Sequence, residues 1–579
     1  MTTQRSRLVR RVPVLQLVSV VLAVTGLVLG YVGFREYLEE HPEFGHGFFD
    51  LLYYSCQLFV LDADPLNGTG SLPWALEWAR FLAPLATLSA LVEAVRLLGA
   101  DELRRLRLAR LRGHSVVCGA GSAAQMLAAR LREAGRTVVV VSAAGTEDDG
   151  GLSVAGDPSS LEALRAAGVA RASAVYACAE DSGDNVLIAA TVRELVQDPT
   201  HALHVHAAIG DQDLCSALQA RHLMGASRGR VRLDFFNVDV LAARRLAATE
   251  RIEEHDAATP PPHCLIVGVS PFARALVVEL ARRWRLRPGT DKLPITWAGA
   301  SATAELRRLR DQYGFLPEVC RIEPKEIEET GSAVNALLSA TGSPAQRVYV
   351  AGPSDDTSLS IALSAFEAWR VAPGGLVLQL REPGPFGVSL GHDDSALLDD
   401  LDGRLRTFGV LDAACRPDLL GDDLVEHLAR VMHEHYEQAA RSNRGDSEQT
   451  HASVVPWDRL SPPKQEDNRR AAVAIGEKLR EIDCAIAPRV DPAPPFVLAD
   501  TEVERLAKME HKRWLRAHRA EGYVYGPDRD DDARTHPDMK DWAELTETAR
   551  EKDREAVRVL PVVLATAGFQ IIRLAPAGS

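Results

Sequence analysis

The sequence has no paired cysteine motif, and this absence limits both its chemistry and its compartment. Its eight cysteines are scattered, without a CxxC pair or an adjacent set of histidines. A zinc site or a disulfide framework is therefore not expected, and most of the chain should lie in a reducing compartment. No P-loop, nucleophile–base set or metal cluster stands in a convincing context, so we do not expect an enzyme.

Basic residues are also fewer than acidic residues in this chain. The chain has 66 Lys and Arg against 80 Asp and Glu, and its formal net charge is −14. Since no excess of basic residues exists to neutralise phosphates, general nucleic-acid binding is not expected. The 579 residues are too many for one compact core and include no low-complexity tract, which favours three to five domains.

Long apolar runs are confined to the first hundred residues, a predicted pore-like domain over 1–100. The runs 13–34 and 73–98 are each long enough to span a bilayer as a helix. Arginines flank both outer ends and the connection is acidic, so the positive-inside rule predicts two spans with N- and C-termini cytoplasmic. We expect the inner (plasma) membrane; a cleaved signal peptide is the alternative for the first run.

Between the spans, GHGFFDLLYYSCQLFVLD is apolar but only about half a membrane long. Helix, half-helix, helix is the layout of a two-span pore protein, in which the middle segment is a re-entrant helix. The alternative is an extracellular amphipathic cap without a pore.

The stretch QLFVLD stands where a two-span channel would have its selectivity filter, but it lacks the residues that such a filter needs. A potassium filter needs glycines for its ladder of carbonyl groups, and this stretch has none. We expect a pore that is not potassium-selective, with Phe59 in an apolar gate and Asp62 and Asp64 ringing the mouth to favour cations. The alternative for both aspartates is a solvated turn.

At residue 114 the pattern changes to strand, glycine-rich turn, helix and strand. Gly119 permits the tight turn, Gly121 lets a pyrophosphate approach the backbone, and Ala124 allows close helix–strand packing. Ser142 stands where a ribose-binding carboxylate would end the second strand. Recognition of adenosine through a carboxylate is therefore not expected.

The next stretch, AGDPSSLEALRAAGVARASAVYACAEDSGDNVLIAATVREL, resembles the regulator-of-potassium-conductance (RCK) family, also called Trk-type NAD-binding domains. The matching residues are Gly156, Asp157, Leu164, Ala167, Gly168, Val169, Asp181, Asp184 and Asn185. The resemblance implies a Rossmann domain over 114–255 that binds a nucleotide, NAD or related. Its expected binding residues are Gly119, Gly121, Ala124, Asp157, Asp181 and Asn185. The alternative is a scaffold that binds nothing.

A second copy follows over 261–420. HCLIVGVSPFARALVVEL (263–280) aligns without a gap with HSVVCGAGSAAQMLAARL (114–131). Ser270 replaces Gly121 and Pro271 follows it, so we expect this second phosphate turn to be degenerate.

The C-terminal region contains another duplication, over 424–488 and 501–575, separated by a proline-rich linker, 489–500. LARVMHEHY (428–436) aligns with LAKMEHKRW (506–514). The second copy continues with EGYVYGPDRDDDARTHPDMKDWAEL (521–545), and with this run it resembles the ryanodine-receptor (RyR) repeat domain, a small helical module. We expect a nucleotide-like ligand there, bound by His511, Trp514, Tyr523, Tyr525, Gly526, His536, Pro537 and Arg554. The alternative is a protein-docking module; the histidines are expected to be structural, not metal ligands.

The predicted fold class is multidomain: two transmembrane helices with a re-entrant half-helix, two α/β Rossmann-like domains, and small α-helical RyR-type repeats. By resemblance, four chains would form an eight-lobed ring below a tetrameric pore, with 101–113 as the linker. We expect a ligand-gated channel sensing a nucleotide-like ligand, of which a bacterial defence effector is a variant. The alternative is a membrane-anchored, non-conducting regulator or scaffold that binds a nucleotide or a partner protein.

Overall fold

The computed structural model comprises two compact units, residues 1–110 and 111–579. The described residues are 14–41, 44–45, 47–61, 72–143, 152–196, 203–225, 231–256, 259–287, 289–341, 345–382, 386, 390–391, 397–416, 424–442, 455–490 and 496–574.

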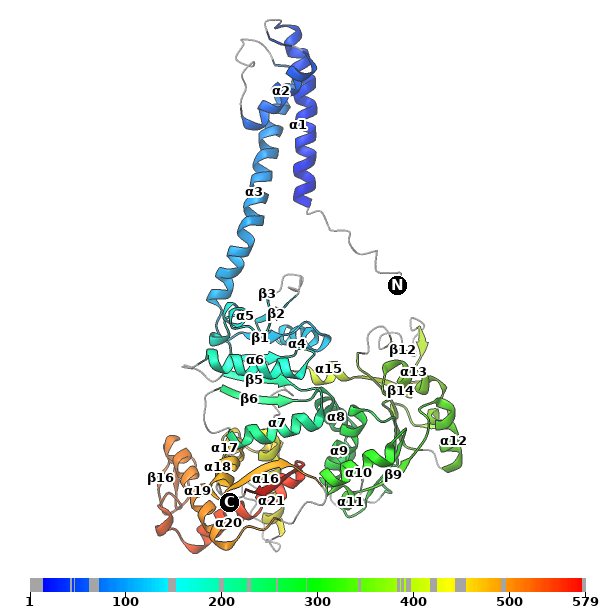
Figure 1. The fold of residues 1–579 in the computed structure, drawn as a ribbon, viewed down its shortest axis with the longest axis vertical. Coiled ribbons are helices and arrows are strands. Elements are labelled where there is room, and N and C mark those ends of the chain that lie inside the picture. The colour runs from blue at the N-terminus through cyan, green and yellow to red at the C-terminus, as the bar shows by residue number, and fades with distance from the viewer. Residues whose placement is uncertain are drawn as a thin grey trace. The chain divides into compact units, whose positions relative to one another are not determined.

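The first unit is built from two long helices and a short apolar helix between them (Figure 1). These are α1 (Val14–Glu39), α2 (Phe48–Gln57), the 3₁₀ turn η1 (Leu58–Val60) and α3 (Trp74–Arg110). By length and composition, two helical stretches could cross a membrane, Val18–Glu39 and Trp74–Val92. Helix α3 continues through most of the predicted linker 101–113, as far as Arg110. The segment DELRRLRLAR has strong helix formers and no glycine or proline to stop the helix.

Small residues bring α1 and α3 into close contact. A Cβ atom on Gly33 would lie 2.7 Å from the Leu76 backbone nitrogen, and one on Gly26 would lie 3.2 Å from that of Ala83. Between these two positions, a Cβ atom on Gly30 would lie 3.3 Å from the Cβ atom of Ser55 and 3.2 Å from the side chain of Leu58. One glycine-bearing face of α1 therefore packs against both α3 and the segment at the filter position.

Gly33→Leu is expected to destabilise this helix pair by about 1–3 kcal/mol, because the added side chain must push the α3 backbone away. The measurement is thermal unfolding of the full chain in detergent. Val28→Leu is the matched control, since Val28 lies on the same helix with 55% of its surface exposed. An equal effect of both substitutions would contradict this packing.

The second unit begins with a parallel six-stranded sheet in the order β3-β2-β1-β4-β5-β6 (Figure 1). Its strands are β1 (Ser115–Cys118), β2 (Val138–Ser142), β3 (Leu152–Ala155), β4 (Ala174–Ala177), β5 (Leu203–Ala208) and β6 (Val231–Phe236). Its helices are α4 (Ser122–Glu133), α5 (Leu161–Ala166), α6 (Ser182–Leu195), α7 (Gln212–Gly225) and α8 (Val238–Glu250). This strand order is that of a dinucleotide-binding Rossmann fold, as predicted.

The second sheet repeats the same order, β9-β8-β7-β10-β11-β14, again parallel. Its strands are β7 (Cys264–Val267), β8 (Leu293–Ala298), β9 (Cys320–Lys325), β10 (Arg347–Val350), β11 (Leu376–Leu380) and β14 (Leu405–Gly409), with a separate pair β12 (Leu390–Gly391) and β13 (Leu398–Asp399). Its helices are α9 (Pro271–Arg285), α10 (Ala302–Gln312), α11 (Leu316–Val319), α12 (Gly331–Thr341), α13 (Asp355–Ser364) and α15 (Val410–Ala414). The predicted duplication of a Rossmann-like domain is confirmed.

The two Rossmann copies share one core, which includes α8 and α9. At the end of α8, the carboxylate of Glu250 is buried and contacts Arg347 and Arg406 of the second sheet. The Tyr349 hydroxyl donates to the same carboxylate at 3.1 Å. This cluster fixes the first copy to the second.

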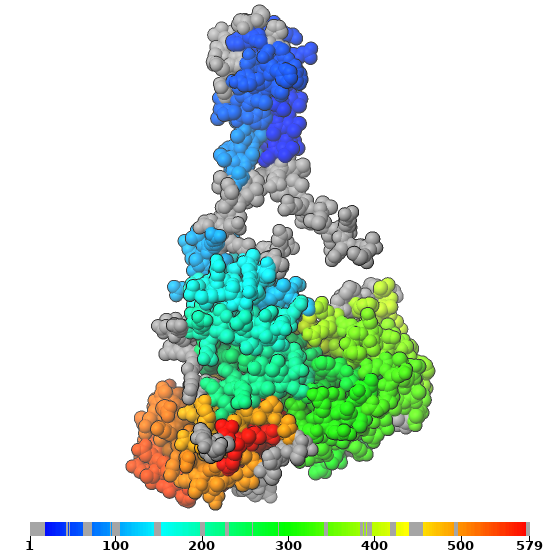
Figure 2. All heavy atoms as spheres, in the orientation of Figure 1, coloured from blue at the N-terminus to red at the C-terminus, as the bar shows by residue number. Residues whose placement is uncertain are grey.

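The C-terminal repeats lie together as one module (Figure 2). The two repeats share a hydrophobic core. The first contains α16 (Leu424–Ser442), α17 (Pro462–Val473), α18 (Ile475–Glu481) and β15 (Cys484–Pro488). The second contains α19 (Asp500–Ala520), β16 (Val524–Tyr525), β17 (Thr535–His536), α20 (Glu547–Arg558), α21 (Leu560–Thr566) and β18 (Phe569–Arg573). Antiparallel pairing of β15 with β18 and a buried ion pair of Lys478 with Glu510, at 2.6 Å, join the copies. The module rests on α7, where Arg480 donates to the Met224 carbonyl.

Candidate functional site

The glycine turn of the first Rossmann domain has the geometry that a phosphate group needs. Gly119 has φ +135°, and a Cβ there would overlap the carbonyl group of Cys178. Gly121 precedes α4, whose first turn receives no side-chain cap, and the nearest group to a Cβ at Gly121 is the Glu180 side chain at 3.5 Å. An uncapped helix N-terminus with an approachable backbone suits an anion. Ala124 is buried against the sheet, as predicted.

The other predicted binding residues lie at the same carboxyl edge but bond to the protein. The side chain of Asn185 is buried, and its Oδ1 atom accepts a hydrogen bond from the Ala179 backbone nitrogen at 2.7 Å. Its Nδ2 atom donates to the carbonyl groups of Ala179 and Ala208, both at 2.9 Å. Asp181 caps α6, and Asp157 accepts from the backbone and hydroxyl of Ser159 at 2.8 Å. The structure thus gives these three side chains a role in shaping the loops, and their contact with a ligand stays a prediction.

In the second Rossmann domain the equivalent turn is filled by the protein itself. Gly268 repeats the strained conformation of Gly119, with φ +109°. Ser270, which replaces Gly121, accepts from the Ala273 backbone at 3.2 Å and donates to the Ala351 carbonyl at 2.9 Å. The Glu329 carboxylate accepts from the Val269 backbone at 3.0 Å, as a ligand phosphate would. This gives a physical reason for the degenerate turn that the sequence predicts.

The segment at the filter position is a 3₁₀ turn packed on α3. The Phe59 carbonyl accepts a hydrogen bond from the Thr87 hydroxyl of α3 at 2.9 Å, so it is bonded within the chain. Leu61 follows with φ 60°, a left-handed conformation that is rare for leucine. Asp62 and Asp64 lie outside the described residues, and their proposed place at a pore mouth stays a prediction.

Two predicted RyR ligands, His511 and Arg554, have their polar atoms occupied inside the module. His511 is buried between the Lys540 carbonyl, at 2.8 Å, and the Asp553 carboxylate, at 3.2 Å. Burial lowers the pKa of His511, but these two partners outweigh burial and raise the pKa overall. Arg554 donates to Glu504, Glu547 and Glu551. We therefore assign both side chains to the framework of the module.

The first copy repeats this framework. His433 bonds to the Val455 carbonyl at 2.7 Å and lies 5.8 Å from the Trp457 ring; the matching His511–Trp542 distance is also 5.8 Å. Arg469 lies over Trp457 as Arg554 lies over Trp542, both at 5.9 Å. The recurring residues of the two copies are therefore packing residues.

The remaining predicted RyR residues gather on one surface of the second copy. Trp514 lies 4.2 Å from His518 and 4.9 Å from His536, and His518 lies 5.1 Å from Tyr523. Tyr525 is exposed beneath the Lys540 ammonium at 4.3 Å. Gly526 and Pro537 follow β16 and β17, where a Cβ at Gly526 would lie 2.6 Å from Thr535. This surface offers half-buried aromatic rings to a ligand or a partner.

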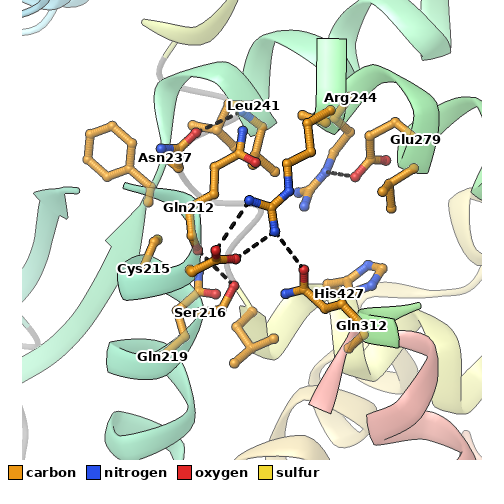
Figure 3. Close-up of a pocket in the computed structure, with 18 of the residues that line it drawn as sticks. Gln212, Cys215, Ser216, Gln219, Asn237, Leu241, Arg244, Glu279, Gln312 and His427 are labelled. Carbon is orange, nitrogen blue, oxygen red and sulfur yellow. Dashed lines mark hydrogen bonds and ion pairs between the residues drawn. The ribbon is translucent and has the colours of Figure 1, made fainter. Parts of the chain in front are cut away.

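A cavity of about 90 Å³ lies where both Rossmann domains meet the C-terminal module (Figure 3). Arg274 of α9 crosses it to Asp213 of α7 at 2.7 Å and to Gln312 at 3.0 Å. His427 of α16 contributes an Nε2 atom without a hydrogen-bond partner among the described residues. Burial, Arg282 and Arg244 hold the pKa of His427 well below its usual value. The residues of this cavity come from helices far apart in the chain, so no motif or spacing in the sequence predicts it.

Comparisons with known proteins agree with the two domain resemblances. Residues 115–226 match the TrkA-N domain model, and residues 499–573 match the RyR domain model. No curated protein matches the chain.

Among solved structures, GsuK bound to ADP is 18% identical, over 71% of this chain and 97% of that chain, with a TM-score of 0.36. The GsuK channel bound to NAD is 15% identical, over 85% of this chain and 90% of that chain, with a TM-score of 0.36. A dipicolinate synthase chain from Bacillus halodurans is 10% identical, over 54% and 96%, with a TM-score of 0.20.

Proposed function

We propose that this chain forms part of a membrane pore regulated by a nucleotide that binds the glycine turn of its first Rossmann domain. The observation that carries the proposal is the contrast between the two turns. The first leaves the N-terminus of α4 uncapped at Gly121, whereas the second is closed by Ser270 and Glu329. A domain that only assembles would need no such difference, and the open copy is the one that matches the TrkA-N model.

The membrane part of the proposal rests on α1, α2 and α3. Two helical stretches are apolar enough to span a bilayer, and the shorter apolar segment packs between them. A homotetramer, cation selectivity without potassium preference, cytoplasmic termini and a role in bacterial defence belong to the same proposal. A ligand would open such a pore by binding one shape of the cytoplasmic part more tightly than another.

Gly121→Glu is expected to abolish dinucleotide binding, because a carboxylate would then occupy the place of the phosphate. Isothermal titration of the full chain in detergent with NAD measures this. Ser270→Glu is the matched control in the second copy, and it should leave NAD affinity unchanged. Binding of NAD by the Gly121→Glu variant with wild-type affinity would contradict the assigned site.

A second candidate is a membrane-anchored scaffold that conducts nothing. The bond between the Phe59 carbonyl and the Thr87 hydroxyl favours it, since this carbonyl already has a hydrogen-bond donor on the neighbouring helix. This candidate predicts no ion flux with any nucleotide.

A further inference from the structure

A large groove lies at the opposite, amino-terminal edge of the first sheet. It has a volume of about 1550 Å³, and Gly113, Thr137 and Ser173 line it just before β1, β2 and β4. Its other wall is the first C-terminal repeat, through α16 and α17. The groove is thus separate from the glycine turn, which lies at the carboxyl edge.

The groove is strongly basic in a chain whose net charge is −14. Eight arginines line it, against four carboxylates: Arg136, Arg232, Arg244, Arg245, Arg283, Arg430, Arg469 and Arg470, with Asp234, Glu426, Asp458 and Glu466. Five of these arginines have a carboxylate partner: Arg244 pairs with Glu279, Arg283 with Glu253, Arg430 with Asp458, Arg469 with Glu426, and Arg470 with Glu466 and Glu521. Arg136, Arg232 and Arg245 are exposed, and among the described residues none of the three has an ion pair. Several positive charges therefore converge on the groove without a protein partner.

A stack of aromatic rings lies along the same groove. Tyr176 and His206 face each other across β4 and β5, with ring centroids 5.1 Å apart and planes 12° apart. His204 continues the stack at 6.3 Å and 13°. His206 is only 7% exposed, yet its Nδ1 atom has no hydrogen-bond partner in the described part of the chain. Burial, His204 and Arg136 lower the pKa of His206 to about 4, so the ring is neutral near pH 7.

We propose that this groove binds a nucleotide carrying two or more phosphates, with the phosphates at Arg136, Arg232 and Arg245 and the base beside the ring stack. Guanidinium groups match phosphate oxygens in geometry and charge. Neutral aromatic rings give a base a stacking partner, and Nδ1 of His206 offers it a hydrogen bond. The three exposed arginines have no role in the packing of the sheet, whereas Tyr176 and His206 are buried and present only part of their surface to the groove.

Such a ligand would contact two modules at once. Arg136 and Arg232 belong to the first Rossmann domain, while Arg430 and Arg470 on the far wall belong to the first C-terminal repeat. The junction cavity shares Gln219, Arg244 and Leu424 with the groove. Binding would therefore change how the repeat rests on the domain, which gives the first C-terminal repeat a function.

The test is isothermal titration of ATP, AMP and inorganic pyrophosphate into the full chain in detergent. Arg136→Gln/Arg232→Gln removes two phosphate contacts, and Arg245→Gln on α8 is an independent second variant. Arg165→Gln is the control, because Arg165 is an exposed arginine of α5 outside the groove. Equal melting temperatures show that the variants fold.

The expected result is ATP affinity at least tenfold lower in the double variant and unchanged in the control. ATP should bind more tightly than AMP, and pyrophosphate should compete with it. The Gly121→Glu variant should keep ATP binding in the groove even where it loses NAD. Unchanged ATP affinity in both groove variants, or complete loss of ATP binding in Gly121→Glu alone, would overturn the groove site and leave the proposed function standing.

Discussion

Glu250→Ala is expected to lower the free energy of unfolding of the second unit, residues 111–579, by about 3 kcal/mol, because it leaves the partners of a buried carboxylate without their counter-charge. Arg347 and Arg406 would face each other without a counter-charge, and the Tyr349 hydroxyl would lose its acceptor. Differential scanning calorimetry of the full chain measures the loss.

The neighbouring exposed pair provides the control for this substitution. Glu254 pairs with Arg251 at 3.6 Å, and both side chains are more than half exposed. Glu254→Ala should change stability by less than about 0.5 kcal/mol. Glu250→Gln, which keeps one acceptor oxygen, should fall between the two. If Glu250→Ala were as mild as Glu254→Ala, the junction between the Rossmann copies would not depend on this cluster.

Gly119→Ala is expected to cost about 3 kcal/mol or more and to abolish NAD binding. Its φ of +135° is strained for alanine, and the added methyl group would overlap the Cys178 carbonyl, which cannot move without displacing β4. Calorimetry and titration with NAD measure the two effects.

Gly225→Ala, at the end of α7, is the control for this strain, since a Cβ there meets nothing within 4 Å. It should be neutral in both measurements. Retention of full stability by Gly119→Ala would show that the turn is looser than described.

The sequence predicted the two Rossmann domains well because local rules determine them. The glycine turns at Gly119 and Gly268 need conformations that other residues avoid, and each follows an apolar strand. The gapless repeat between 114–131 and 263–280 then fixed the duplication. Most of the predicted linker 101–113 is helical, because the residues that follow the apolar run also favour helix.

The candidate sites were less predictable, for two physical reasons. The resemblance to the RyR domain predicts His511 and Arg554 as ligand-binding residues, but the equivalent histidine and arginine pack around a tryptophan in both copies. The basic groove and the junction cavity depend on how α7, α8 and α16 meet. The spacing of residues along the chain carries no information on such contacts. The net charge of the whole chain is negative, so it gives no sign of the local excess of arginine in the groove.

The most direct test of the account is ion flux through the full chain reconstituted in liposomes, with and without NAD and ATP. We predict cation flux that changes on addition of nucleotide, and a response to NAD that Gly121→Glu removes while Ser270→Glu retains it. No flux under any of these conditions, with nucleotide binding intact, would contradict a nucleotide-regulated pore and favour the non-conducting scaffold.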